Sequence, residues 1–255
     1  MPRRRANGVH SQTGVCMIHP VFLVTLSYFL IGAAAIGLIN TKTGPDARRT
    51  LWTKYAVYFV IVHAVILSVL AEWFLFVASC LVAIGLLELL RMTARNPEGP
   101  PNRLPLALTA YLLLCFGFVR FALIGRSQEI LFVYLVVLTF DGFSQITGQL
   151  VGAHRLAPRV SPGKTLEGLV GGVAFALMTA ALASSWSAVS RGYALALSSL
   201  LCASALAGDL AASWLKRSCR VKDFGNLLPG HGGVLDRFDS FIAAGCVYWV
   251  CVGER

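Results

Sequence analysis

A polar stretch near the C-terminal end of the chain, Ser213–Asp239, carries most of the residue types that could do chemistry. Carboxylates and cations alternate in it, and a further carboxylate lies just upstream. Fixed carboxylates beside fixed cations are what a site needs to hold a divalent metal ion and a phosphate together. A loop that only joins two membrane helices needs no such alternation, so the stretch indicates an enzyme. The residues concerned are Asp209, Asp223, Asp236 and Asp239, with Lys216, Arg217, Arg220, Lys222 and Arg237.

The approach to this stretch carries a helical stripe. Asp209, Ser213, Lys216 and Arg220 are spaced i, i+4, i+7 and i+11, which places them on one face if the helix continues. A carboxylate at the end of an apolar run costs several kcal/mol unless it is compensated. Metal binding would compensate Asp209, and an ion pair with Lys216 or Arg217 would do so without any function.

Two turn signals, Gly225-Asn226 and Pro229-Gly230, allow the chain to double back after this helix. His231-Gly232-Gly233 follows, and adjacent glycines let backbone N–H groups come close to an anion such as a phosphate. His231 could act as a general acid or base, orient a phosphate or cap the loop, because one histidine in a loop does not separate these roles.

The last apolar run begins with another acidic face. Asp236, Asp239 and Ser240 lie at i, i+3 and i+4, and the two acids would repel each other unless a cation lies between them. Glu88, near the end of the third apolar run, could pair with Arg91 at i+3.

A second polar segment, Ser161–Gly168, precedes the sixth apolar run. Its Gly163-Lys164-Thr165 invites comparison with a P-loop, but Pro158 stands where that motif needs glycine and no buried strand precedes it. What remains is a hydroxyl, a lysine and a backbone turn at the start of a helix. This arrangement indicates a phosphate grip, or else a helix cap with a lysine that reaches toward water.

Composition identifies the elements that must position these residues as membrane helices. The 255 residues are 56% hydrophobic and 13% charged, with a mean hydropathy of +0.70, whereas soluble domains carry about 25% charged residues. The net charge of +10 is explained by cationic loops beside apolar spans, and we expect no nucleic-acid binding. The seven cysteines form no CxxC pair, so they predict neither a zinc site nor a disulfide framework.

The apolar runs predict an all-α integral membrane protein with about eight transmembrane helices, within a range of seven to nine, and cytosolic polar loops. We divide the chain into N-terminal transmembrane helices, 1–140, and a catalytic half, 141–255. The predicted spans are Val21–Ile39, Tyr55–Ala71, Trp73–Leu90, Leu104–Val119, Ile130–Ile146, Leu169–Ser185, Tyr193–Leu210 and Phe238–Val252.

Charge in the short loops predicts the orientation. With the N-terminus outside, 15 of the 22 Lys and Arg residues fall in inner loops, and the positive-inside rule places the polar stretch in the cytosol. Arg3, Arg4 and Arg5 disagree, which a translation start at Met17 would explain. A cleaved signal peptide is the other interpretation, but Val21–Ile39 is longer than the usual apolar core of such a peptide, and we expect a retained helix.

The spacing of the polar stretch resembles the signature of the phosphatidate cytidylyltransferases, also called CDP-diacylglycerol synthases. The matching positions begin with Ser213-x-x-Lys216-Arg217 and Lys222-Asp223, and end with Pro229-Gly230-His231-Gly232-Gly233-x-x-Asp236-Arg237-x-Asp239. Ser161–Gly168 followed by Gly171-Gly172 resembles a second motif of that family, and Asp141 with Gly148 resembles the start of its conserved half. The likeness runs from about Asp141 to the C-terminus.

The resemblance implies transfer of a cytidylyl group from CTP to phosphatidate at a magnesium site, with potassium in at least some members. It implies that Asp209 and Asp236 are the metal ligands and that Asp223 and Asp239 support them. It also implies a lipid substrate, a homodimer, and a place in a bacterial cytoplasmic membrane with the site facing the cytosol. The catalytic set would further include Lys216, Arg217, Lys222, His231 and Arg237, and CTP and its phosphates would contact Ser161, Lys164, Thr165, Glu167, Ser213, Gly232 and Gly233.

Four positions depart from the family pattern: Ala212, Gln149, Leu166 and Gly163 stand where Glu, Arg, Trp and Lys are common. These departures allow a different lipid phosphate as acceptor, or an inactive relative kept as a scaffold. A CTP-dependent polyprenol kinase is a second alternative, since it shares part of the nucleotide-binding pattern. A transporter that uses Asp141 and Asp209 as an ion path is a third, and the clustering of acids with phosphate-type cations counts against it.

Overall fold

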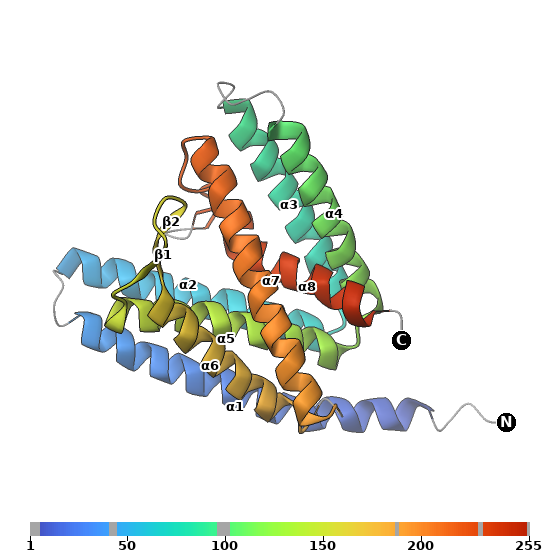
Figure 1. Ribbon diagram of the computed structural model, residues 1–255. Coiled ribbons are helices and arrows are strands. Elements are labelled where there is room, and N and C mark those ends of the chain that lie inside the picture. The colour runs from blue at the N-terminus through green and yellow to red at the C-terminus, as the bar shows by residue number, and fades with distance from the viewer. Residues whose placement is uncertain (1–5, 41–44, 96–102, 187–188, 229–231, 254–255) are drawn as a thin grey trace.

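Helices make up most of the chain, as the apolar runs predict (Figure 1). The structure is a computed structural model, and it describes residues 6–40, 45–95, 103–186, 189–228 and 232–253. Within these ranges the elements are α1 (Ala6–Asn40), α2 (Pro45–Leu70), α3 (Phe74–Arg95), α4 (Arg103–Ile124), α5 (Ser127–Val151), β1 (Arg155–Ala157), β2 (Ser161–Thr165), α6 (Leu166–Ala183), α7 (Arg191–Ser218) and α8 (Leu235–Val252).

Seven helices in the described ranges are long and apolar enough to cross a membrane, and they are α1 to α7. The predicted all-α membrane fold is therefore confirmed. The eighth predicted span does form a helix, α8, but α8 is not one of the seven. The reason lies in its first turn and a half, where Asp236, Arg237 and Asp239 occupy part of an 18-residue helix.

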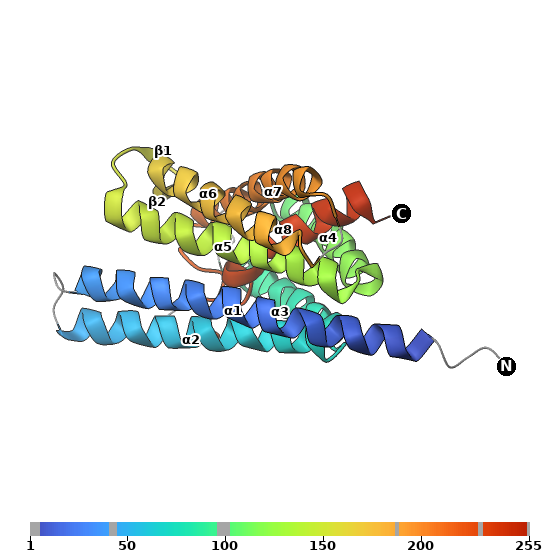
Figure 2. The same cartoon turned by 90° about the horizontal axis from the view of Figure 1, so that it is seen from below.

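Helix α5 is the centre of the bundle. Of its membrane-span residues 61% are buried, against 28–39% in the other six spans. Every residue from Ile130 to Val137 is buried, which matches an apolar run without polar faces. Helices α1 and α2 pack on one side of α5, and α6 and α7 pack on the other (Figure 2). Because Asp141 lies on this helix, the polar site is built against the most enclosed element of the fold.

Glycines bring α5 and α6 into close contact. A Cβ atom added at Gly168 would lie 2.6 Å from the Ser144 carbonyl oxygen, and one added at Gly172 would lie 2.6 Å from the Phe140 carbonyl oxygen. Small residues four apart on one helix face let two backbones approach closely, which is a principal source of helix association in membranes. The close approach holds the start of α6, and with it the segment before α6, against α5.

We therefore expect Gly172→Ala to destabilise the protein. The new methyl group would overlap the α5 backbone, and overpacking of this kind costs about 1–3 kcal/mol. Thermal unfolding in detergent measures the effect as a lower Tm. Gly37→Ala on α1 is the matched control, because nothing lies within 4 Å of a Cβ atom there. Equal Tm values for both variants would contradict the close packing.

The segment between α5 and α6, which the sequence suggested only as a polar loop, contains a short antiparallel hairpin. β1 pairs with β2 so that Arg155 lies opposite Thr165 and Ala157 opposite Ser161. Thr165 ends the hairpin and caps α6, since its hydroxyl oxygen accepts from the Gly168 N–H at 3.1 Å. The hairpin therefore delivers the side chain of Lys164 at a fixed place next to the helices.

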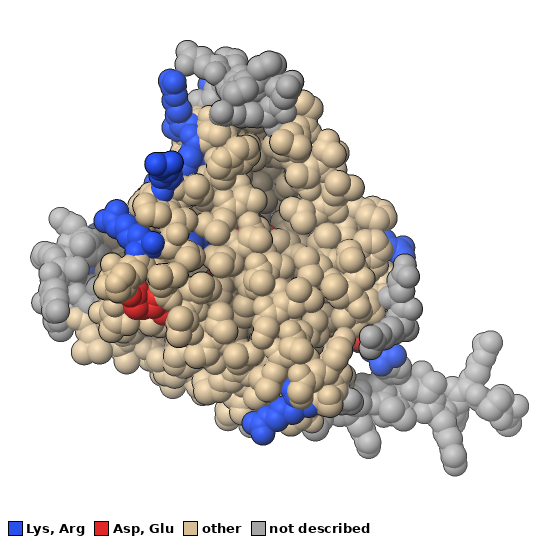
Figure 3. All heavy atoms as spheres, in the orientation of Figure 1, with Lys and Arg blue, Asp and Glu red and all other residues tan. Residues whose placement is uncertain are grey.

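Charged side chains are confined to the margins of the face seen in Figure 3. Lys and Arg gather at the upper left, over the hairpin and the C-terminal end of α7, while the wide surface between the margins carries almost no charge. Such an uncharged belt is what a protein needs where lipid tails surround it.

Candidate active site

The predicted stripe on α7 exists as far as the helix continues. The Ser213 hydroxyl donates to Asp209 Oδ1 at 3.3 Å, and Lys216 follows on the same face. α7 ends at Ser218, and Arg220 lies beyond it with φ of 57°. The stripe therefore includes Asp209, Ser213 and Lys216, and the prediction that Arg220 continues it is wrong because the chain leaves the helix first.

Asp209 takes its positive partner from the hairpin. The Lys164 ammonium group forms an ion pair with Asp209 Oδ2, and the two side chains are 23% and 27% exposed. The alternative interpretation, an ion pair of Asp209 with Lys216 or Arg217, is not what the structure shows. An adjacent position on the same helix was the obvious partner in sequence, but the hairpin brings a lysine from 45 positions away along the chain.

Lys216 instead reaches across to α8. Its Nζ donates to Asp236 Oδ1 at 2.6 Å, and the two side chains are only 10% and 1% exposed. The Lys216 ammonium group also lies 5.0 Å from the centre of the Phe224 ring, a cation–π distance. A charge pair this well enclosed fixes α7 against α8, because removing either partner would leave an uncompensated buried charge.

The second oxygen of Asp236 fastens the loop between α7 and α8. Oδ2 accepts from the backbone N–H groups of Phe224 and Gly233, each at 2.8 Å. Gly232 has φ of +81°, and a Cβ atom there would lie 3.0 Å from Asp236 Oδ2, so this position requires glycine. In this structure the anion that the Gly233 N–H approaches is the carboxylate of Asp236. His231 lies outside the described residues.

Two further acids adjoin these ion pairs. The Asp141 carboxyl lies near the Ser240 side chain and near the charged groups of Asp209, Lys164 and Arg237. Asp239 lies within electrostatic range of Asp209, Asp141 and Lys216. The structure thus brings together, from α5, β2, α7 and α8, a cluster that we call the charged cluster: Asp141, Lys164, Asp209, Ser213, Lys216, Asp236, Arg237 and Asp239.

Other predicted residues surround the charged cluster. The Arg217 guanidinium donates to the carbonyl oxygens of Val160, at 3.4 Å, and Val221, at 3.1 Å, so it links α7 to the hairpin turn. Lys222 and Asp223 are exposed in the loop after α7, and Asp223 lies against Gly232. Ser161 and Thr165 lie at the two ends of β2.

Glu167 holds the start of the hairpin. Its Oε2 accepts from the Ala153 N–H at 3.0 Å, and its Oε1 lies 2.6 Å from His154 Nδ1. We predicted Glu167 as a residue that contacts CTP or phosphate, and this role stays a prediction. Its contacts with Ala153 and His154 hold the start of the hairpin, and the second strand of that hairpin carries Lys164.

Sequence reasoning missed the role of Glu88. We expected it to pair with Arg91, but both of its carboxylate oxygens accept backbone N–H groups at the start of α8. The only signal in the sequence was an acid within an apolar run, which indicates a function or a partner without saying which.

The described residues contain no group of three His, Cys, Asp or Glu side chains that could hold a metal ion. Two carboxylates of the charged cluster, Asp209 and Asp236, each face one lysine ammonium group. Such pairs can bind phosphates through the lysines and a cation through the acids.

Seven apolar helices of membrane-spanning length in the described ranges, with a charged cluster built from α5, β2, α7 and α8, define a multi-pass membrane protein. The chain belongs to the cytidylyltransferase family, whose pattern it matches over residues 12–253. This match covers both predicted halves of the chain.

Curated relatives agree with this membership. A phosphatidate cytidylyltransferase of Brucella abortus is 43% identical over 122 residues, which are 48% of this chain and 45% of the relative. One of Rickettsia bellii is 31% identical over 202 residues, 75% of this chain and 78% of the relative. One of Bacillus subtilis is 40% identical over 115 residues, 44% of this chain and 43% of the relative. The matched segment thus spans less than half of the Brucella and Bacillus proteins.

Proposed function

We propose that this protein transfers the cytidylyl group of CTP to phosphatidate and forms CDP-diacylglycerol and pyrophosphate. Family membership and the activity named for its relatives support the proposal. The main structural observation in favour of the proposal is the presence of two ion pairs, Lys164–Asp209 and Lys216–Asp236. They join the hairpin, α7 and α8 in one site, where cations for phosphates lie beside carboxylates for a metal ion.

The reaction requires an oxygen of the lipid phosphate to attack the α-phosphorus of CTP. A new oxygen–phosphorus bond forms while the bond from the α-phosphorus to its bridging oxygen breaks, and the electron pair leaves with pyrophosphate. Both reactants are anions, so Lys164, Lys216 and Arg237 reduce their repulsion and stabilise the charge of the transition state. No covalent nucleophile is needed, and positioning provides much of the remaining acceleration.

Magnesium fits the donor chemistry of the site, and we propose that Asp209 and Asp236 hold it. Proteins usually bind this ion through one or two carboxylates together with substrate phosphates, so a group of three protein ligands is not required. Asp209 Oδ2 pairs with Lys164 and Asp236 Oδ1 with Lys216, and an oxygen with two lone pairs keeps one for a cation. When bound, the ion supplies positive charge that polarises a phosphate and neutralises its oxygens.

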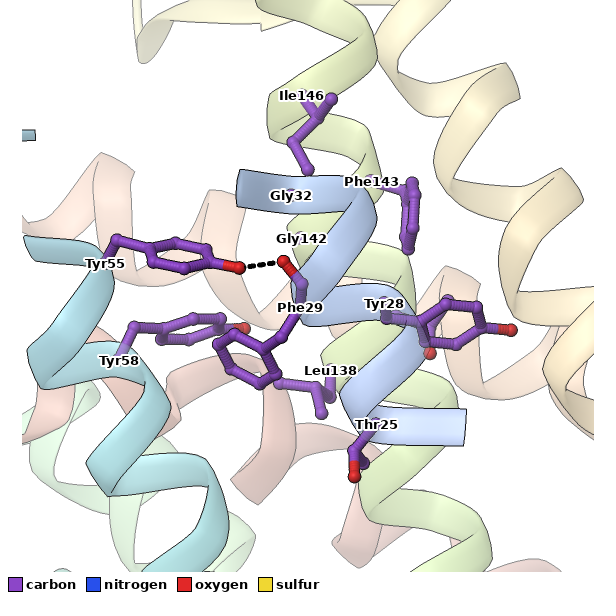
Figure 4. Close-up of a pocket in the computed structure, with 11 residues that line it drawn as sticks. Thr25, Tyr28, Phe29, Gly32, Tyr55, Tyr58, Leu138, Gly142, Phe143 and Ile146 are labelled. Atoms are coloured by element: carbon purple, nitrogen blue, oxygen red, sulfur yellow. Dashed lines mark hydrogen bonds between the residues drawn. The ribbon is translucent and has the colours of Figure 1, made fainter. Parts of the chain in front are cut away.

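A cavity beside the charged cluster supports a lipid as the acceptor. It lies between α1, α2 and α5 and is lined mainly by apolar and aromatic groups (Figure 4). Figure 4 shows Tyr55 reaching from α2 to the backbone carbonyl of Phe29, which closes one wall. A second cavity shares Tyr58 and Leu138 with the first and is also lined by Asp141 and Arg237. The apolar lining of the first cavity suits hydrocarbon, and the charged groups of the second suit a phosphate headgroup.

A larger side chain at Leu138, which lines both cavities, should therefore weaken lipid binding selectively. We expect Leu138→Trp to raise the KM for phosphatidate roughly tenfold and to leave the KM for CTP near its wild-type value. Val170→Trp, on a 69% exposed position of α6, is the control for adding a tryptophan to a span. Steady-state kinetics in mixed micelles measure both constants, with Tm as a check on folding. Equal rises for both substrates would contradict the lipid assignment.

We further propose that the charged cluster faces the cytosol, where CTP is available, in a bacterial cytoplasmic membrane. The excess of Lys and Arg in the loops on that side supports this orientation. We retain the homodimer as part of the proposal, and light scattering of the purified protein in detergent tests it.

The experiment that tests the function is product analysis with purified protein in detergent micelles. CTP, magnesium and phosphatidate should give CDP-diacylglycerol and an equal amount of pyrophosphate, and omission of magnesium should abolish both. Parallel reactions with potassium replaced by sodium test the second cation. Polyprenol replaces phosphatidate in a further reaction, and formation of CDP with a phosphorylated alcohol there would favour the kinase alternative and overturn the proposal.

A further inference from the structure

Glu88 is a buried acid of α3 that the reaction described above does not use. Glu88 is only 3% exposed. Oε1 accepts from the Val234 N–H at 2.9 Å and Oε2 accepts from the Leu235 N–H at 2.8 Å. Val234 is the N-cap of α8 and Leu235 is its first residue, so one side chain from the N-terminal part of the chain satisfies two backbone donors at the start of this helix.

The loop before α8 is shaped around this carboxylate. A Cβ atom at Gly225 would lie 2.7 Å from Glu88 Oε1, and one at Gly233 would lie 2.5 Å from Oε2. Real Cβ atoms essentially never come this close to another heavy atom. A side chain at either position would displace the Glu88 carboxylate from this place, and both glycines belong to the polar stretch that first suggested an enzyme.

Position and charge make this contact specific. A carboxylate at the N-terminus of a helix is favoured by the helix dipole, and a buried carboxylate is stable only when hydrogen bonds replace its water. Asp236 follows Leu235 directly, and its two oxygens hold Lys216, Phe224 and Gly233. A shift at the start of α8 would therefore move Asp236, and with it Lys216, out of the charged cluster.

We propose that Glu88 is a positioning residue of the active site: through the first N–H groups of α8 it fixes the place of Asp236. The proposal rests on the proposed function for its kinetic consequence. It makes the N-terminal helices part of the catalytic apparatus, because α3 sets the geometry of a site whose acids and lysines lie on α5, β2, α7 and α8.

Glu88→Gln tests the proposal, because the amide keeps the size of the side chain but offers one acceptor oxygen and turns an N–H₂ donor toward the other backbone N–H. We expect kcat to fall about 10- to 100-fold, the loss typical of residues that orient a metal ligand, and the half-saturating magnesium concentration to rise. Glu88→Asp keeps the carboxylate and should recover part of the loss.

A purely structural role would lower stability without changing the magnesium requirement. Leu89→Ala is the matched control, since Leu89 is the next residue on α3 and is 1% exposed. Its aliphatic side chain has no acceptor for the N–H groups at the start of α8, which bind Glu88. It should lower Tm and leave both kcat per folded molecule and the magnesium requirement unchanged.

Amide hydrogen exchange gives a readout that does not depend on the reaction. In Glu88→Gln the N–H groups of Val234 and Leu235 should exchange about 10- to 100-fold faster, and peptides of α4 and α6 should be unchanged. Wild-type exchange at these two amides, or a wild-type magnesium requirement in Glu88→Gln, would overturn the proposal. If the wild-type protein shows no cytidylyl transfer, the proposed function is contradicted but the role of Glu88 is not. Hydrogen exchange at Val234 and Leu235 in the wild type and in Glu88→Gln would still decide whether Glu88 holds the start of α8.

Discussion

Asp209→Asn is expected to lose turnover by roughly 100- to 1,000-fold or more while the protein keeps its fold, because the loss of a charge that serves the transition state costs about this much. Asp209 is proposed to hold magnesium and pairs with Lys164 of the hairpin. Both side chains are about one quarter exposed, so breaking their ion pair should cost only about 0–1 kcal/mol of stability. The expected result is an inactive protein with a Tm close to that of the wild type.

The measurement combines initial rates at saturating magnesium with thermal unfolding in the same detergent. Glu72→Gln is the control for removing a carboxylate, because Glu72 is exposed in the turn between α2 and α3. Near-normal activity of Asp209→Asn at saturating magnesium would show that the metal assignment is wrong.

Asp236→Asn is expected to abolish turnover for two reasons at once. It removes a proposed metal ligand, and it leaves the ammonium group of Lys216 buried without its charged partner. Breaking a buried pair by removing one member costs about 3–5 kcal/mol, which corresponds to a fall in Tm of roughly 6–20 °C for a protein of this size. The protein should still insert into the membrane, because the apolar spans are unchanged.

A double variant separates the two effects. Lys216→Met combined with Asp236→Asn removes both charges of the pair, while the amide oxygen can still accept from the N–H groups of Phe224 and Gly233. It should restore much of the lost Tm and none of the turnover. A wild-type Tm for Asp236→Asn would contradict the buried pair, and turnover by the double variant would contradict the catalytic role of Asp236.

The membrane fold could be predicted from the sequence because its signal is local. Every predicted span corresponds to a helix, since a long apolar run in a chain of high hydropathy has to satisfy its backbone hydrogen bonds internally. The status of α8 could not be predicted from length alone. Its three charged residues near the start serve the charged cluster, and that use depends on contacts with α3 and α7.

The residue types of the site could also be predicted, but several of their partners could not. The Asp209–Ser213 contact follows from helical periodicity. The Lys164–Asp209 pair depends on a hairpin whose second strand, Ser161–Thr165, contains Pro and Gly and looks like a turn. The contact of Glu88 with α8 joins positions 146 residues apart, and no local pattern encodes such a distance.

The central claim is attack on the α-phosphorus of CTP, and the most direct test is to follow labelled phosphorus atoms through the reaction. Purified protein, phosphatidate and magnesium are incubated with CTP labelled at the α-phosphorus or at the γ-phosphorus, and lipid and soluble products are separated. The proposed function predicts that the α-label enters the lipid and the γ-label appears only in pyrophosphate, with neither transfer in Asp209→Asn. Entry of the γ-label into the lipid, or no labelled lipid from the wild-type protein, would contradict it.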